Sequence, residues 1–376
     1  MRLHWIDALK GIGIILVVLA HYSLPIAFDT YIFSFHMPLF FFISGFLFDF
    51  VKYAESASNF VKGRFKSLIV PYFCFAVITC IFCFLIDELY TPGITSIKFF
   101  ENSMLHGISH IFVAFGPAVS YNPPLWFLTC LFVTELLFYG LEKKYYGEPK
   151  KLVLWLIIAG VIGYLYSVYV PFRIPWNVDV ALTAIVFYGA GNIFRKFTDI
   201  GSRASFNLKV NSEFTEKFAR IEKYLPFMAI FLSLLYLGYL LKFPTDDKIN
   251  MNILKYGNFF SFYLLAFSGI FTFVYISKRI VSSKVLEYYG RNSLTILALH
   301  FPLKDVLIKL AIIILGVDIE YIHYNVGIAL GLTVLNLTLL VPVIYVINNY
   351  FPFILGKKVT SKNIEVFKAC FRKLVS

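Results

Sequence analysis

The stretch IDALKGIGIILVVLAH, residues Ile6 to His21, decides the fold of this chain. It opens an apolar segment, 6–27, that is long enough to cross a bilayer, yet it carries three ionisable side chains. At 100° per residue of an α-helix, the step from Lys10 to His21 closes three turns with about 20° left over, and Asp7 lies one turn before Lys10. The three side chains therefore fall within a sector of roughly 60°. Each ionisable group in a membrane helix costs on the order of 2.5–3.5 kcal/mol unless it faces protein or a wet cavity, so this stripe predicts a functional site.

The composition of the whole chain is that of a helical membrane protein. Of its 376 residues, 59% are hydrophobic and only 15% are charged, which differs from the usual balance of a soluble domain. Apolar runs of about 20 residues, the length that crosses the hydrocarbon core as a helix, recur along it. We expect an all-α polytopic membrane protein of ten transmembrane helices. The predicted spans lie at 6–27, 31–50, 67–87, 124–141, 152–170, 178–195, 224–242, 256–277, 293–315 and 324–349.

The lysine and arginine residues test this number of spans, because cytoplasmic loops are enriched in them. With the N-terminus inside, 26 of the 34 fall on the cytoplasmic side, five on the opposite side and three within spans. This asymmetry predicts that both termini are cytoplasmic. It also accounts for the net charge of +12, and basic residues scattered over loops do not predict nucleic-acid binding.

The domain organisation is simple. We expect one transmembrane domain over 1–350, followed by a basic amphipathic cytoplasmic tail over 351–376. The apolar residues of the tail share one face, which is typical of an interfacial helix. Four of the five cysteines lie in predicted spans, so a disulfide framework is not expected.

His21 is the leading candidate for catalysis. A neutral imidazole in a partly dry cavity can accept a proton from a hydroxyl group, although a buried histidine can also serve packing alone. We expect His21 four to six residues inside the outer end of its helix, with His36 at a similar depth in the antiparallel second helix. Lys10 either snorkels to the cytoplasm or faces the same cavity.

Other ionisable residues within spans are candidates for that cavity, or are satisfied by packing between helices. They are Asp7, His36, Glu135, His300 and Lys304. His300 and Lys304 are four residues apart and share a helix face. Trp126, at the start of a span, has the position of an interfacial anchor. No metal site is expected, because His106 and His110 have a suitable spacing but no evident third ligand.

Five stretches, in order along the chain, carry a resemblance to a known family. They are IDALKGIGIILVVLAH (Ile6 to His21), FSFHMPLFFFISGF (Phe33 to Phe46), RFKSLIVPYF (Arg64 to Phe73), PLWFLTCLFVTELLFY (Pro124 to Tyr139) and GRNSLTILALHFPL (Gly290 to Leu303). Together they resemble the acyltransferase 3 family of integral membrane O-acyltransferases, in particular its fucose 4-O-acetylase-like branch.

The resemblance implies transfer of an acyl group, usually acetyl from acetyl-CoA, to a hydroxyl of a cell-envelope carbohydrate or a lipid-linked glycan at the inner membrane. The family motif of a basic residue, ten positions and a histidine maps onto Lys10 and His21, which makes His21 the implied catalytic histidine. Where the family often has an arginine pair, this chain has Lys62, Arg64 and Lys66. We expect these three to bind the phosphates of the acyl-CoA donor at the inner mouth of the cavity. Acyl-CoA is a substrate here, and no cofactor is implied.

Two other classes of function fit the residues taken alone. A transporter or flippase also places ionisable groups along a polar intramembrane pathway. A non-catalytic membrane partner uses such groups to fix helix packing. The sequence leaves open whether His21 acts as a general base or carries the acyl group covalently, and on which side of the membrane transfer occurs.

Overall fold

The computed structural model describes residues 3–22, 24–88, 104–114, 121–198, 212–245, 247–280, 282–316 and 325–358. These residues form helices and contain no β-strand, which confirms the predicted all-α class. The longer helices are α1 (His4–Ala20), α2 (Ile26–Leu47), α3 (Ala57–Arg64), α4 (Val70–Glu88), α5 (Met104–Val113), α6 (Trp126–Lys144), α7 (Pro149–Tyr169), α8 (Val178–Thr198), α9 (Ser212–Lys242), α10 (Phe259–Arg279), α11 (Lys284–Arg291), α12 (Ser293–Leu315) and α14 (Val326–Tyr350).

Each of the ten predicted spans coincides with a helix. In the part of the chain that the structure describes, eight helical segments have the length and hydropathy of a membrane span. The other two positions are α1, which is only 17 residues long, and α12, which carries Lys304, Asp305 and Lys309. The polytopic architecture is thus confirmed. Most of the predicted tail at 351–376 lies outside the described residues.

The first helical hairpin is tighter than predicted. Helix α1 ends at Ala20 with His21 as its C-cap, and α2 begins immediately after Pro25. Proline suits the start of a helix and not its interior, so the chain turns before it. His21 therefore lies at the end of its helix and not four to six residues inside it. His36 lies ten residues into α2 instead of five.

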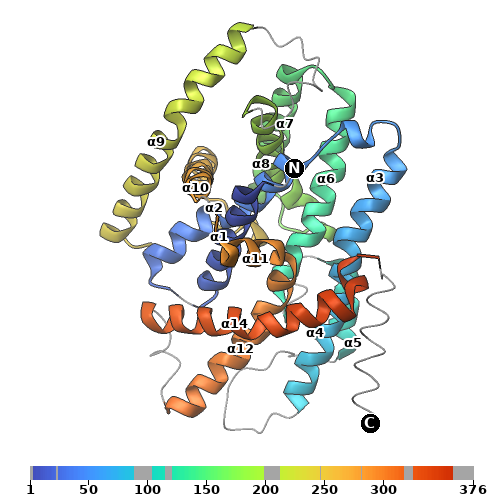
Figure 1. Cartoon of the computed structure of the whole chain (residues 1–376), viewed down its shortest axis with the longest axis vertical. Coiled ribbons are helices and arrows are strands. Elements are labelled where there is room, and N and C mark those ends of the chain that lie inside the picture. Colours follow the sequence, from blue (N-terminus) through green and yellow to red (C-terminus); the bar gives the residue numbers. More distant parts are fainter. Residues whose placement is uncertain are drawn as a thin grey trace.

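Helix α1 is the centre of the bundle, in contact with α2, α10, α11, α12 and α14 (Figure 1). Two glycines allow α11 to approach it closely. A Cβ at Gly11 would overlap the carbonyl oxygen of Leu286, and a Cβ at Gly290 would overlap that of Asp7. This backbone contact brings the end of α11 and the start of α12 beside the polar end of α1.

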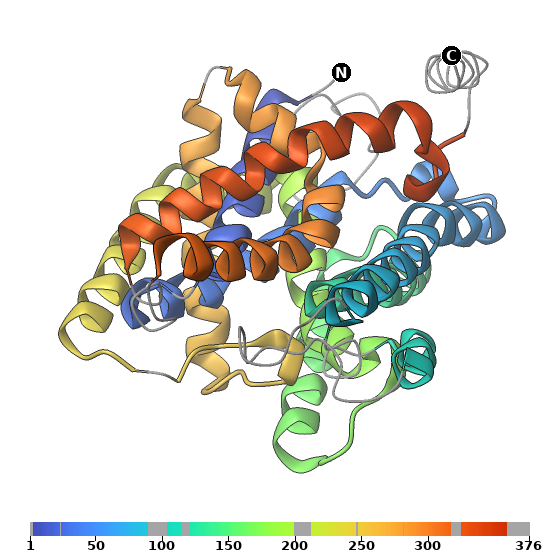
Figure 2. The same ribbon diagram turned by 90° about the horizontal axis from the view of Figure 1, so that it is seen from below.

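The remaining helices surround this centre. Helix α2 packs on α8 and α10, α7 and α6 pack on α8, and α9 packs on α10. Helix α14 lies across α12 (Figure 2). Helices α2, α6 and α12 thereby cover the polar face of α1. Both cavities of the candidate site lie there.

Candidate active site

Two cavities lie end to end along one face of α1. The first, here called the lysine cavity, has a volume of about 370 Å³. Its polar lining consists of Asp7, Lys10, Ser44, Arg291 and Ser293. The second, here called the histidine cavity, has a volume of about 230 Å³. Its polar lining consists of His21, His36, Trp126, Asn250 and Asn252.

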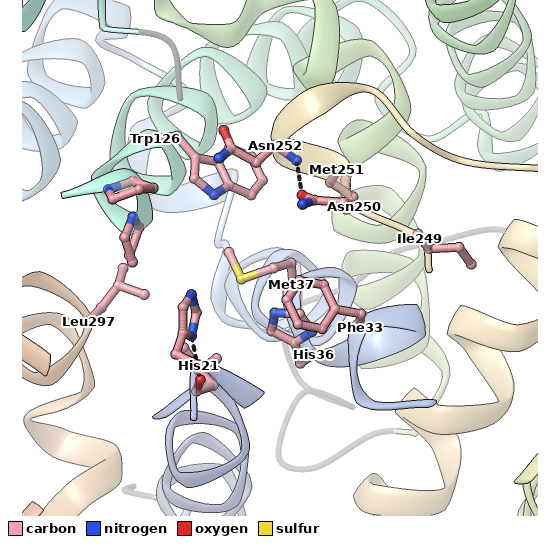
Figure 3. A pocket seen from close by; sticks show the side chains of 13 residues that line it. His21, Phe33, His36, Met37, Trp126, Ile249, Asn250, Met251, Asn252 and Leu297 are labelled. Atoms are coloured by element: carbon pink, nitrogen blue, oxygen red, sulfur yellow. Dashed lines mark hydrogen bonds between the residues drawn. The ribbon is translucent and has the colours of Figure 1, made fainter. Parts of the chain in front are cut away.

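His21 presents a proton acceptor to the histidine cavity. Its Nδ1 lies 2.7 Å from the carbonyl oxygen of Val17, one turn back along α1. A carbonyl oxygen only accepts, so in the neutral ring Nδ1 carries the proton and Nε2 keeps its lone pair. The ring stands on the end of α1 and points into the cavity (Figure 3). This is the geometry that a general base requires.

His36 faces the same cavity from α2, as predicted from the antiparallel hairpin. Its Nδ1 lies 2.8 Å from the carbonyl oxygen of Ile32, which fixes the same tautomer as in His21. Two imidazoles, from α1 and α2, therefore offer Nε2 lone pairs to one small space. The ring of Phe33 lies near both, with its centroid 6.4 Å from that of His21 and 4.9 Å from that of His36.

His300 of α12 lies against His21, with ring centroids 5.0 Å apart and planes at 71°. Its side chain is fully buried, and its Nδ1 donates to the backbone of the preceding turn. Its Nε2 has no hydrogen-bond partner among the described residues. His300 therefore contacts His21 through ring packing, and it is not among the described residues that line either cavity.

Lys304 is held beside this cluster but does not line either cavity. Its ammonium group lies 2.8 Å from a carboxylate oxygen of Asp305 and 3.8 Å from the ring centroid of Phe301. Phe301 in turn packs edge-on against His21, with centroids 5.5 Å apart. The charge of Lys304 is therefore balanced locally, in a pair whose two side chains are each only 13% exposed.

The lysine cavity contains the other end of the α1 stripe. Asp7 and Lys10 both line it, so Lys10 faces a cavity as the spacing with His21 indicated. Arg291, the last residue of α11, adds a second cation to the wall. Its Nε donates to the carbonyl oxygen of Glu287, one turn back in α11, and this bond fixes the position of the guanidinium. Cations in a wall of this kind suit a phosphorylated ligand.

The cluster predicted to bind the donor is arranged differently. Arg64 forms an ion pair with Glu135, with Nε and a carboxylate oxygen 3.2 Å apart. The guanidinium also lies over the ring of Phe60, 5.4 Å from its centroid. Lys62 and Lys66 are exposed. None of these residues lines either cavity, so Arg64 and Glu135 form a structural pair between α3 and α6 and not part of the cavity wall.

Sequence reasoning missed six polar residues of the cavity walls: Ser44, Trp126, Asn250, Asn252, Arg291 and Ser293. Trp126 is not an interfacial anchor: it is 5% exposed and lines the histidine cavity. Asn250 and Asn252 reach the same cavity from the segment between α9 and α10, where no periodic pattern marks them. Arg291 lies in one of the five quoted stretches, GRNSLTILALHFPL. Its position in that stretch, directly before α12, was the only feature of the sequence that could have marked it as a site residue.

A thin apolar layer separates the two cavities. Leu297 lines both of them. On α1 the lining passes from Ile14 in one cavity to Val17 in the other, and on α2 from Phe40 to Met37. These steps are one turn of helix or less, about 5 Å along the axis. A ligand held in one cavity needs to displace only this layer to reach the other.

The comparison with known proteins identifies a family. A family model described as an acyltransferase domain matches residues 3–353, which include both cavities. No curated protein and no solved structure has significant similarity to the chain.

Proposed function

This chain belongs to the acyltransferase 3 family of integral membrane acyltransferases, and we propose that it transfers an acetyl group from acetyl-CoA to a hydroxyl group of a cell-envelope carbohydrate at the inner membrane. One observation carries the proposal. The Nε2 of His21 faces a cavity that only an apolar layer separates from a second, cationic cavity. One cavity suits a neutral hydroxyl acceptor and the other suits the phosphates of CoA.

Donor binding is assigned to Lys10 and Arg291. Both line the lysine cavity, and Arg64 lines neither cavity. Lys62 and Lys66 are exposed and can add to the attraction of an anionic donor without forming the wall. The thioester end of the donor then extends past Leu297 towards His21. Lys10 and His21 are eleven residues apart, a rise of about 16 Å along the helix.

The proposed reaction is a direct transfer. The acceptor hydroxyl donates its hydrogen bond to Nε2 of His21, and its oxygen attacks the thioester carbonyl carbon as the proton moves to the imidazole. A carbon–oxygen bond forms and the carbon–sulfur bond breaks, and the leaving sulfur takes the proton back from Nε2. The hydrogen bond from Nδ1 to Val17 stabilises the imidazolium between these two steps, because it persists in both protonation states.

The test is transfer by the purified protein. The protein in nanodiscs is incubated with radiolabelled acetyl-CoA and an envelope glycan fraction, and the products are analysed by mass spectrometry. We expect a glycan heavier by one acetyl group, formed without a membrane gradient. The same protein is also reconstituted into sealed vesicles. Uptake of label into these vesicles with no covalent product would instead support a transporter.

A further inference from the structure

The segment 247–256 forms one wall of the histidine cavity. It contributes Ile249, Asn250, Met251 and Asn252 to the lining. Three contacts hold this segment against the helices around it. They are the ion pair of Lys248 with Asp29 at 2.6 Å, the bond from Arg173 to the carbonyl oxygen of Asn252 at 2.7 Å, and the bond between the hydroxyls of Tyr256 and Thr183 at 2.8 Å.

Within this segment the amide of Asn250 has a fixed orientation. Its backbone forms two hydrogen bonds with Lys255, of 2.7 and 3.0 Å. Its Oδ1 accepts the backbone N–H of Asn252 at 3.1 Å. Because an N–H can only donate, the side-chain oxygen must be on that side, and the amide nitrogen is on the other. No partner for Nδ2 is present among the described residues, and the amide end points towards the interior of the cavity (Figure 3).

The rest of the cavity wall complements this donor. His21 and His36 offer acceptors, and the indole nitrogen of Trp126 is a second donor with no partner in the described part of the chain. None of the described residues that line this cavity is a lysine, arginine, aspartate or glutamate. The volume of about 230 Å³ lies below the range of roughly 300–1,000 Å³ that drug-sized ligands occupy. Such a space fits one neutral ring with several oxygens.

We propose that Asn250 is a specificity-determining residue that selects a polyol acceptor. Its Nδ2 donates to a second oxygen of the acceptor while His21 accepts the proton of the reacting hydroxyl. This inference rests on the proposed function, and it adds the residue that contacts a second oxygen of the acceptor: the acceptor needs a hydroxyl near the reacting one, which a simple alcohol lacks. A site built to bind a hydroxyl discriminates strongly against an analogue that lacks it.

Asn250→Asp is the decisive variant. Aspartate keeps the oxygen that accepts from Asn252 and removes the Nδ2 donor. The matched control is Asn258→Asp, because Asn258 also uses its Oδ1 to accept two backbone N–H groups, at the start of α10, and does not line the cavity. Asn250→Ala is a second test that introduces no charge. Elution as a single species from size exclusion checks that each variant is folded.

The probes are cyclohexanol and the 1,2- and 1,3-cyclohexanediols, with radiolabelled acetyl-CoA as donor and the envelope glycan fraction as positive control. We expect the wild type to prefer its best diol over cyclohexanol by about tenfold in kcat/KM, mostly through KM, as the loss of one good hydrogen bond implies. Asn250→Asp and Asn250→Ala should reduce this preference to twofold or less, because kcat/KM falls more on the diols than on cyclohexanol. Asn258→Asp should keep the preference.

Three results overturn the inference. A diol preference that persists in both Asn250 variants shows that another group reads the second oxygen. An equal loss on cyclohexanol and the diols assigns Asn250 to the reaction step or the fold. Transfer to the glycan but to neither class of alcohol shows that a single diol ring is not what the cavity recognises. Absence of transfer to every acceptor, the glycan included, would contradict the proposed function itself.

Discussion

The lysine cavity and the histidine cavity share helix α1 and the side chain of Leu297, yet they differ in charge. One wall carries Asp7, Lys10 and Arg291, whereas the polar groups that the described residues give the other are imidazoles, an indole and amides. The difference corresponds to two kinds of ligand: a polyanionic donor and a neutral, oxygen-rich acceptor. The comparison of the two cavities shows that a single helix can line both a charged site and a neutral site when an apolar layer separates them.

The largest expected effect comes from His21→Ala. Removing a general base typically lowers the rate of the chemical step by about 10²- to 10⁴-fold. We expect such a loss in kcat, with binding of acetyl-CoA unchanged, because His21 lines only the histidine cavity. Single-turnover transfer and equilibrium binding of acetyl-CoA measure the two effects separately. The control is His4→Ala, an exposed histidine on the same helix that should retain activity within twofold. Near-normal turnover of His21→Ala would show that His21 is not the general base.

Substitutions in the lysine cavity should act on donor binding instead. Loss of one charge-assisted hydrogen bond costs about 1.5–3 kcal/mol, or roughly ten- to a hundredfold in affinity. Lys10→Ala and Arg291→Ala are therefore expected to raise the KM for acetyl-CoA by this factor and to leave the KM for the acceptor unchanged. Lys62→Ala, which removes an exposed lysine outside the cavity, is the matched control and should raise the donor KM by twofold or less. The opposite pattern, with the acceptor KM affected and the donor KM constant, would reverse the assignment of the two cavities.

A smaller effect is expected at the apolar layer. Leu297→Trp enlarges the side chain that lines both cavities. Overpacking at this point costs about 1–3 kcal/mol, and we expect transfer to fall about tenfold while acetyl-CoA still binds in the lysine cavity. Leu297→Met, which is close in volume, should transfer at nearly the normal rate. If Leu297→Trp transfers normally, the donor does not pass this residue.

The smallest effect on activity is expected at the Arg64–Glu135 pair. Breaking a buried ion pair costs about 3–5 kcal/mol, and less here because the Arg64 side chain is 26% exposed. Glu135→Gln should lower the Tm and leave both KM values within twofold. The double variant Arg64→Met with Glu135→Leu should recover much of the lost stability, since no unpaired charge remains. If Glu135→Gln raises the KM for the donor and leaves the Tm unchanged, Arg64 and Glu135 take part in donor binding and are not only a structural pair.

The helices and the polar face of α1 were predictable from sequence, because both depend on local periodicity. Runs of apolar residues marked ten helices, and the spacing of Lys10 and His21 placed them on one face. The end of α1 was predicted too late in the chain, because its apolar character continues to Ala27 while Pro25 already starts the next helix.

The walls contributed by distant segments were not predictable in this way. Asn250 reaches the histidine cavity because the segment between α9 and α10 packs against α2, where Lys248 pairs with Asp29. Arg291 reaches the lysine cavity because two glycines allow α11 to pack closely against α1. The pairing of Arg64 with Glu135 likewise depends on how α3 and α6 pack. Sequence spacing describes one helix at a time and carries no information about these contacts.

A structure of the protein with a non-reactive thioether analogue of acetyl-CoA, determined by electron cryo-microscopy, tests the central claim most directly. We predict that phosphate groups of the analogue contact Lys10 and Arg291, that Leu297 is displaced, and that the acetyl group lies beside Nε2 of His21. An analogue bound elsewhere, or one whose acetyl group stays in the lysine cavity behind an intact apolar layer, would contradict this account.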